Sequence, residues 1–204
     1  AAAVLTLVLE RVIPYLPRWN QAIGDLRTDT LHALFSTAAI PEMFKALCFG
    51  GLLAAGQPLH SAAGVSLWPH GLPVWVQAPL ALVVAEFGQY WVHRLGHERE
   101  ILWRLHSIHH SAGRLYWLNS GRFHPLDTFL QYGSEVTLLT LLGAGPEVMA
   151  LYTVFTTIHG LFQHCNIDAK LGPLNWIFSM AELHRWHHSR NITEANMNYG
   201  SNLL

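Results

Sequence analysis

Histidines in three short clusters are the residues of this sequence best placed to do chemistry. The clusters read His-x-x-x-His at 93–97 and His-x-x-His-His at 106–110 and 184–188, and eleven of the 14 histidines lie between His93 and His188. Imidazole is the commonest metal ligand among protein side chains and is mostly neutral at pH 7. One metal ion rarely takes more than about four to six protein ligands. The sequence therefore predicts a metal centre with more than one ion.

Helical spacing directs the members of each cluster toward one point, because residues three or four positions apart share a helix face. This gives eight candidate ligands: His93, His97, His106, His109, His110, His184, His187 and His188. Two further candidates, His159 and His164, end an apolar segment. Their i, i+5 spacing separates them by about 140° on a regular helix. His164 is the better candidate, and His159 coordinates only if the helix is distorted or the metals lie on either side of it.

The ligand type narrows the choice of metal. An all-nitrogen set suits iron, zinc or copper and does not suit magnesium or calcium. A dizinc hydrolase more typically includes Asp or Glu bridges, and only Glu98 and Glu182 accompany these clusters. Haem needs two axial histidines and leaves most of the set unexplained. Eight to ten imidazoles fit two metals with four or five ligands each, and two irons held in this way would leave positions open for dioxygen. From the residues alone iron, zinc and copper all stay open, and zinc could also replace iron in a purified protein.

The remaining histidines and the cysteines have simpler interpretations. We interpret His32, His60 and His70 as surface or satisfied core residues, and His124 as a residue that orients a ligand rather than one that coordinates. Cys48 and Cys165 belong to no Cys-x-x-Cys motif, so neither a disulfide framework nor a cysteine zinc site is expected. The net charge of −1 gives no reason to expect a nucleic-acid partner.

Long apolar segments must position these histidines. The chain is 51% hydrophobic and 12% charged, against about 25% charged in soluble domains, and its mean hydropathy is +0.23. Apolar residues fill 29–55, where Pro41 is expected to kink or divide a helix, and also 72–97, 126–142 and 147–164, with a tight turn at 143–146. No strict alternation suggests strands. We predict an all-α, integral-membrane helical bundle with about four spanning or hairpin helices, as one domain over 1–204.

Membrane topology follows from length and charge. A span needs about 20 apolar residues; residues 72–92 qualify, with Glu86 as their only charge, and 126–142 and 147–161 are shorter. Lysine and arginine are absent from 57–77 and 143–147, whereas five arginines lie between 94 and 122. The positive-inside rule then places every histidine cluster on the cytoplasmic side. A soluble bundle with a very apolar core is the alternative. We interpret both chain ends as truncated.

Four stretches of sequence resemble one known family. They are Tyr-Trp-Val-His-Arg-Leu-Gly-His-Glu at 90–98, Leu-Trp-Arg-Leu-His-Ser-Ile-His-His-Ser at 102–111, Phe-Gln-His-Cys-Asn at 162–166, and His-Arg-Trp-His-His-Ser-Arg-Asn at 184–191, followed by Asn-Tyr-Gly at 198–200. The order and spacing of these motifs, over about residues 86–200, resemble those of the fatty acid hydroxylase/sterol desaturase superfamily. The chain stops before the Trp-Asp and Phe-Gly-Thr segments usual there. Members with a tenth ligand often show His-x-x-x-His where His159 and His164 lie one residue further apart.

The resemblance implies an integral-membrane, nonheme di-iron enzyme. Such enzymes use dioxygen and two electrons to hydroxylate a lipid C–H bond, or to desaturate it. The partners would be a bilayer lipid as substrate and a separate redox protein as electron donor, because the chain contains no flavin, haem or iron–sulfur motif. Two alternatives from other classes are a metal-binding membrane protein without redox turnover and a zinc-dependent membrane hydrolase.

Ligand histidines need partners that fix their orientation. We expect Glu86 and Glu98 to accept hydrogen bonds from ligand imidazoles, because Glu86 precedes His93 by seven residues on roughly the same helix face and an intramembrane carboxylate is costly. The alternatives are a structural contact for Glu86 and a solvated surface charge for Glu98. Asn119 and Asn198 are further candidates to orient ligands or water. Four tryptophans are expected at the membrane boundary, namely Trp91, Trp103, Trp117 and Trp186.

Overall fold

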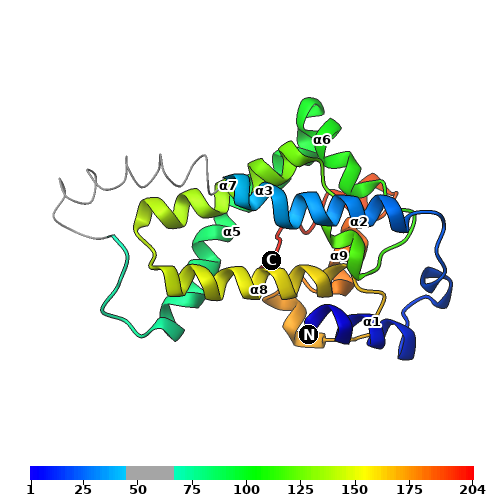
Figure 1. Cartoon of the computed structure of the whole chain (residues 1–204), viewed down its shortest axis with the longest axis horizontal. Helices are drawn as coiled ribbons and strands as arrows, with labels where there is room; N and C mark the ends of the chain where they lie inside the picture. The colour runs from blue at the N-terminus through cyan, green and yellow to red at the C-terminus, as the bar shows by residue number, and fades with distance from the viewer. Residues whose placement is uncertain (45–66) are drawn as a thin grey trace.

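The computed structural model describes residues 1–44 and 67–204, and these residues form helices joined by loops (Figure 1). Within them no β-sheet forms, and two isolated bridges pair loop residues. The prediction of an all-α fold is confirmed for this part of the chain. The α-helices are α1 (Ala2–Val12), α2 (Leu26–Leu34), α3 (Ile40–Phe44), α5 (Val74–Glu98), α6 (Glu100–His110), α7 (Pro125–Leu142), α8 (Pro146–His164), α9 (Ala181–His187) and α10 (Ile192–Ala195). Short 3-10 turns are η1 (Pro17–Asn20), η4 (Trp117–Gly121) and η5 (Gly172–Trp176), and η2 (Phe35–Ala39) is a π-helical turn.

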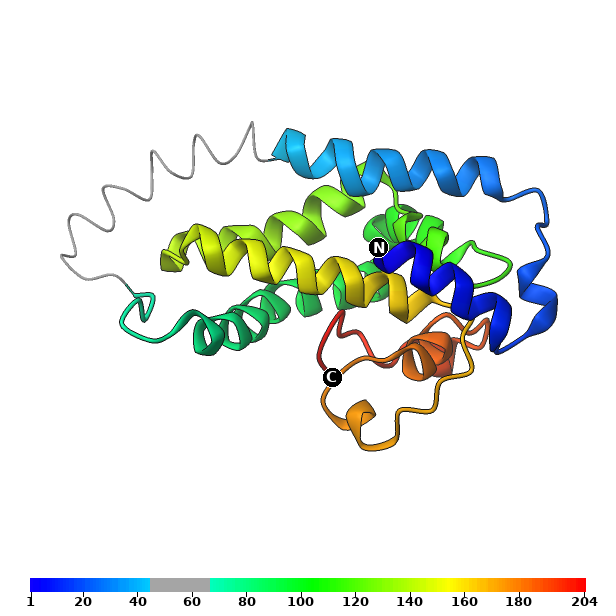
Figure 2. The ribbon, with the colours of Figure 1, turned by 60° about the horizontal axis from the view of Figure 1, so that its bottom comes forward.

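Helix α5 and the hairpin of α7 and α8 form the framework of the molecule. Figure 2 shows α5 along one side of this hairpin and the α2–α3 helix along the other, and α5 contacts α6, α7 and α8. The predicted turn is present: Gly143 takes a left-handed φ of 88° and ends α7, and Pro146 begins α8. Glycine adopts this conformation without a steric penalty, and proline fits the first turn of a helix.

Small residues let these helices approach closely. Ala81 and Ala85 of α5 are fully buried in a core with Leu139. A Cβ on Gly88 would lie 2.7 Å from Leu138 Cδ1 and 3.1 Å from the Ser134 carbonyl oxygen, so α5 and α7 cross where glycine provides the space. This core lies at the end of the bundle away from the histidines.

Pro41 does not divide the helix that begins at Leu26. The chain continues from α2 through the π-helical turn η2 into α3. Proline lacks an N–H and its ring crowds the carbonyl four residues earlier, here Thr37. The wider π-helical turn contains Thr37, so the distortion falls there instead of ending the helix. The rest of the predicted segment, with Cys48, lies outside the described residues, and so does His60.

Apolar side chains cover much of the outer surface. Trp75, Phe87 and Trp91 of α5 are exposed, and so are Val154 and Ile158 of α8. Phe87 and Trp91 are four residues apart, as are Val154 and Ile158, so each pair lies on one helix face. Within 1–44 and 67–204, no helix is long and apolar enough to cross a membrane.

Ion pairs fasten the segment after α6 to α2. Arg114 binds Asp25 through Nε (2.6 Å) and Nη2 (3.0 Å), and Arg122 Nε lies 2.5 Å from Asp29 Oδ1. Asp29 is fully buried and also accepts the hydroxyl of Tyr116 at 2.7 Å. The pairs hold η4 against α2, which places the loop carbonyls that contact the histidines.

Candidate metal centre

Nine of the ten predicted histidine ligands converge into two adjacent groups. The five-histidine site consists of His93 and His97 from α5, His106 and His110 from α6, and His187 from α9. The four-histidine site consists of His109 from α6, His164 at the end of α8, and His184 and His188 at α9. Within each site the candidate ligand atoms lie within 4.8 Å of one another. Five and four imidazoles match the predicted four or five per metal.

The two His-x-x-His-His clusters each divide between the sites, so the prediction that each aims at one point is wrong. In α6, His106 and His110 face the five-histidine site and His109 faces the other. In α9, His187 faces the five-histidine site, whereas His184 and His188 face the other. On a helix, residue i+4 is rotated by about 40° from residue i in one direction. Residue i+3 is rotated by about 60° in the opposite direction, so it faces a different side. A single turn can therefore serve two centres.

Backbone carbonyls fix the orientation of three imidazoles. The Nδ1–H of His93 donates to the Tyr199 carbonyl (2.7 Å), that of His187 to the Met197 carbonyl (2.8 Å), and that of His109 to the Arg122 carbonyl (3.3 Å). A carbonyl only accepts, so each ring carries its proton on Nδ1. The Nε2 lone pair is then left free to bind a metal.

Side-chain oxygens orient three further rings. His164 Nδ1 lies 3.1 Å from Asn119 Oδ1, and His97 Nδ1 lies 3.2 Å from Asn196 Oδ1. The sequence-based proposal that Asn119 orients a ligand thus agrees with its position. His106 Nδ1 lies 2.9 Å from Asp127 Oδ2.

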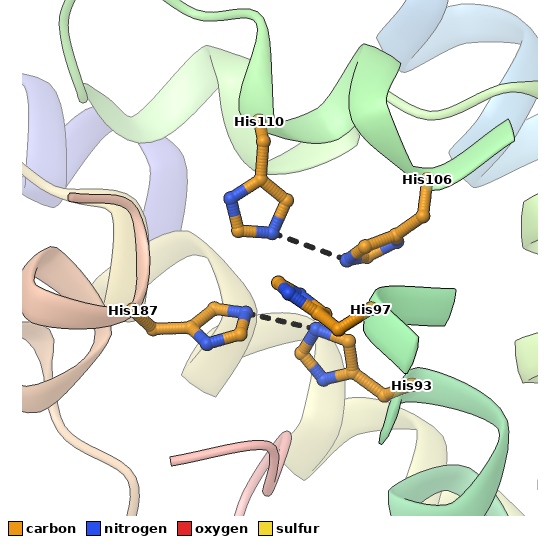
Figure 3. A group of neighbouring side chains, drawn as sticks. All are labelled: His93, His97, His106, His110 and His187. Atoms are coloured by element: carbon orange, nitrogen blue, oxygen red, sulfur yellow. Dashed lines mark hydrogen bonds between the residues drawn. The ribbon is translucent and has the colours of Figure 1, made fainter. Parts of the chain in front are cut away.

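The inward nitrogens lie close together in pairs. Figure 3 shows His187 Nε2 facing His93 Nε2 at 2.9 Å and His110 Nε2 facing His106 Nε2 at 3.1 Å. His93 and His187 both donate from Nδ1, so two bare lone pairs oppose each other. Two facing lone pairs repel unless a cation lies between them. In the four-histidine site, His184 Nε2 lies 2.9 Å from His164 Nε2 and 3.1 Å from His188 Nε2. The residues present therefore fit one metal cation in each site.

Burial keeps these imidazoles neutral, the form that binds metal. Burial and the neighbouring His106 lower the pKa of His97 to about 4. Burial and the neighbouring His97 lower the pKa of His187 to about 3, and burial and His187 lower that of His164 to about 3. Among the described residues, buried His97 Nε2 has no hydrogen-bond partner. It is a donor atom left free within the five-histidine site.

His159 lies outside both sites. Its Nε2 is 3.0 Å from the Ser179 carbonyl, and its ring stacks on Phe155 with a centroid distance of 5.6 Å. The helix α8 is continuous here, so the i, i+5 spacing directs His159 away from His164. His124 caps α7 by accepting from Leu126 N at 3.1 Å, and His32 Nδ1 contacts the Phe123 carbonyl at 2.8 Å.

The predicted contacts of Glu86 and Glu98 with imidazoles are not formed. Glu86 accepts hydrogen bonds from Ser201 N (2.5 Å) and from Asn202 N (3.0 Å) and Nδ2 (3.1 Å). It therefore holds the segment whose Tyr199 carbonyl orients His93. Glu98 pairs with Arg94 at 2.8 Å on the surface, because the i, i+4 spacing keeps both side chains on one exposed face.

Asp127 is the site residue that sequence reasoning missed. It lies in the first turn of α7, 17 residues after His110, and only the fold brings it to His106. The available signal was an acidic residue two positions after Pro125, and acidic residues are also usual in the first turn of a helix. Glu182, the other acid beside the clusters, accepts from Leu171 N (3.1 Å) and Asn175 Nδ2 (2.7 Å) and holds a loop.

Two cavities reach the histidines. The larger, of about 900 Å³, borders His97, His110 and His188 and is lined by several aromatic and charged side chains, including Trp103, Trp186 and Arg185. The smaller, of about 480 Å³, borders imidazoles of both sites; these are His93, His106, His109, His164 and His184. Hydroxyl-bearing side chains of α7 and α8 line it, among them Thr128, Tyr152 and Thr156. A molecule in the smaller cavity would lie next to both sites.

Known proteins with similar sequences include several lipid-modifying enzymes. Ornithine lipid hydroxylase OlsE of Rhizobium tropici is 40% identical over 210 residues, covering 100% of this chain and 62% of that protein. Alkylglycerol monooxygenase of Homo sapiens is 30% identical over 124 residues, covering 61% of this chain and 27% of that protein. Methylsterol monooxygenase 2-2 of Arabidopsis thaliana is 24% identical over 160 residues, covering 75% and 59%. No solved structure matches the chain.

The relatives are longer than this chain, which spans less than two thirds of each. Residues 78–204 match the family described as fatty acid hydroxylase. The matched region contains all nine histidines of the two sites and Asp127. The resemblance noted from the sequence is therefore confirmed: this chain belongs to the fatty acid hydroxylase family.

Proposed function

We propose that this chain is the catalytic core of a membrane-bound lipid hydroxylase that holds two iron ions. The observation that carries the proposal is the pair of adjacent sites with five and four inward-facing imidazoles. An all-nitrogen ligand set suits iron and leaves coordination positions for dioxygen. The names of the relatives, a hydroxylase and two monooxygenases, support the same reaction type.

In this proposal the imidazoles would hold the iron ions, the carbonyls orient the imidazoles, and the iron would supply the oxygen chemistry. The Nε2 atoms of His93, His97, His106, His110 and His187 would hold one ion, and those of His109, His164, His184 and His188 the other. When bound, the iron ions would supply the activation of dioxygen, with the net conversion of R–H, dioxygen, two electrons and two protons to R–OH and water. The carbonyls of Tyr199, Met197 and Arg122 keep the rings in the metal-binding tautomer.

The substrate we propose is a bilayer lipid that enters the smaller cavity. Both cavities border both sites, and the smaller one lies along α7 and α8, where it reaches five of the imidazoles. Exposed apolar side chains on α5 and α8 support a membrane location for the bundle. The arginines that follow α5 support an orientation with the histidines on the cytoplasmic side. A separate redox protein would deliver the electrons.

The test is a turnover experiment with metal analysis. The protein is purified from iron-supplied cells, its iron and zinc are measured, and dioxygen consumption is followed with a lipid extract and a reduced electron donor. Ornithine lipid is the first pure substrate to try, because the relative at 40% identity is named for it. We expect about two irons per chain and a product heavier by one oxygen atom.

The same experiment separates the alternatives. A product lighter by two hydrogen atoms would indicate a desaturase on the same site. Zinc alone despite iron supply, with no dioxygen uptake, would contradict the oxygenase proposal and favour a zinc hydrolase. Bound metal without any change in the lipid would favour a metal-binding membrane protein.

A further inference from the structure

We infer that Asp127 is a positioning residue for His106, and that through it the five-histidine site binds its metal more tightly than the four-histidine site does. The inference rests on the two-metal part of the proposed function. Asp127 touches no candidate metal position. It acts on the ring of a ligand, from the side opposite to the inward Nε2.

The contact between Asp127 and His106 is closed off from solvent. Asp127 Oδ2 lies 2.9 Å from His106 Nδ1, and the two side chains are 7% and 1% exposed. The carboxylate lies in the first turn of α7 and the imidazole in α6, so the bond also joins two helices. An ionised acceptor makes a shorter and stronger hydrogen bond than a neutral one. Exclusion of water keeps that bond from being screened.

Two glutamines hold Asp127 in place. Gln131 Nε2 donates to Asp127 Oδ1 at 3.0 Å, one helical turn along α7. Gln89 Nε2, from α5, donates in turn to Gln131 Oε1 at 3.1 Å. Gln89 is 1% exposed. The chain of hydrogen bonds from α5 through α7 to α6 leaves the carboxylate little freedom to turn away from His106.

No other oriented histidine of the two sites has this kind of partner among the described contacts. The Nδ1 atoms of His93, His97, His109, His164 and His187 meet neutral oxygens of backbone carbonyls or asparagine amides. A carboxylate that accepts from Nδ1–H makes the imidazole a stronger electron donor at Nε2. His106 belongs to the five-histidine site, so the stronger electron donation directly raises the metal affinity of that site alone.

The experiment is a Co²⁺ titration of the purified, metal-stripped full chain, followed by the visible absorption of bound Co²⁺. We compare the wild type with Asp127→Asn, Asp127→Glu and Gln131→Met. The matched control is Glu10→Gln, a carboxylate 2% exposed that accepts from Trp117 N (2.8 Å) and Asn166 N (2.9 Å) instead of from a histidine. The readout is metal affinity and spectrum and does not depend on turnover.

We expect two Co²⁺ ions in the wild type, with unequal affinities. Asp127→Asn should weaken the tighter ion about 10–100-fold and change its absorption bands, because this is the usual effect of removing a ligand's hydrogen-bond partner. Asp127→Glu should restore part of the loss, and Gln131→Met should weaken the same ion less. Glu10→Gln should leave the affinity of the tighter ion unchanged, because its partners Trp117 and Asn166 lie beside the four-histidine site. Gln131→Met tests the inference even if Asp127→Asn does not fold.

Three results would overturn the inference. The first is a wild-type titration curve in Asp127→Asn. The second is an equal loss of affinity at both ions in that variant. The third is a loss of the same size at the tighter ion in Glu10→Gln. If the wild type binds two ions, such a result refutes the role of Asp127 and leaves the two-metal proposal standing. If the wild type itself binds no Co²⁺, both fail together.

Discussion

The imidazole rings of His110 and His188 stack with their centroids 4.3 Å apart and their planes 20° from parallel. His110 belongs to the five-histidine site and His188 to the four-histidine site. The stacked rings therefore form a wall common to the two sites. Each site has its own set of ligands, so the predictions below treat the two ions separately.

We predict that His187→Ala and His109→Ala each remove one metal ion. His187 faces the five-histidine site and His109 the four-histidine site, so each variant should lose about half of the bound metal. Both should lose hydroxylase activity, because the proposed reaction needs both ions. Metal content by mass spectrometry and a folding check by circular dichroism measure this. His70→Gln, at an exposed turn before α5, is the control and should keep full metal content. Full activity in either alanine variant would show that the site assignment is wrong.

We predict that His159→Gln keeps both metal ions. His159 is held by the Ser179 carbonyl outside the two sites, and glutamine can donate to the same carbonyl. The expected loss in the free energy of unfolding is less than about 0.5–1.5 kcal/mol, the usual net contribution of one hydrogen bond, because the donor is kept. Metal content and a urea unfolding curve measure the two effects. Loss of one ion in this variant would mean that His159 is a ligand after all.

We predict that Glu86→Gln destabilises the protein through the 199–202 segment. Glu86 is buried and accepts from three N–H groups of Ser201 and Asn202, which a neutral amide satisfies less well. The expected loss is about 1–3 kcal/mol, with weaker metal binding because His93 loses the firmly held Tyr199 carbonyl. Glu98→Gln, in the exposed pair with Arg94, should cost less than about 1 kcal/mol. Equal losses in the two variants would contradict the role of Glu86.

We predict that the metal-free protein loses stability as the pH falls from 7.5 to 5. The pKa values of His97, His187 and His164 are lowered to about 4, 3 and 3 in the folded chain, against about 6.5 in the unfolded one. The unfolded state therefore takes up more protons below about pH 6.5, which favours unfolding by about 1 kcal/mol or more per histidine at pH 5. Urea unfolding after chelation measures this. His97→Gln should flatten the curve, and a wild-type curve independent of pH would refute the prediction.

The framework of the fold was predictable from the sequence because local signals determine it. The apolar segments 72–97, 126–142 and 147–164 match α5, α7 and α8 within about two residues at each end. Gly143 and Pro146 mark the turn between α7 and α8, and both act through their own backbone geometry. The histidine spacing likewise identified nine of the residues that converge.

The parts that escaped prediction depend on contacts between distant segments. Asp127 joins the site only because α7 packs beside α6, and the partners of Glu86 lie more than a hundred residues away along the chain. The helical angles already separate the members of each His-x-x-His-His cluster. Their assignment to two sites becomes clear only when the positions of both sites are known. Pro41 shows a local rule overridden by a π-helical turn that absorbs the distortion.

The divided clusters have a further consequence for the distance between the two ions. Helices α6 and α9 each supply ligands to both sites. Consecutive residues of one helical turn therefore belong to different sites, and this limits the distance between the two sites. The pitch of the helix sets the spacing of these residues, whereas the ligands from α5 and α8 depend on how the helices pack. The smaller cavity along α7 and α8 can therefore differ in shape while α6 and α9 keep the spacing of the ligands that they supply.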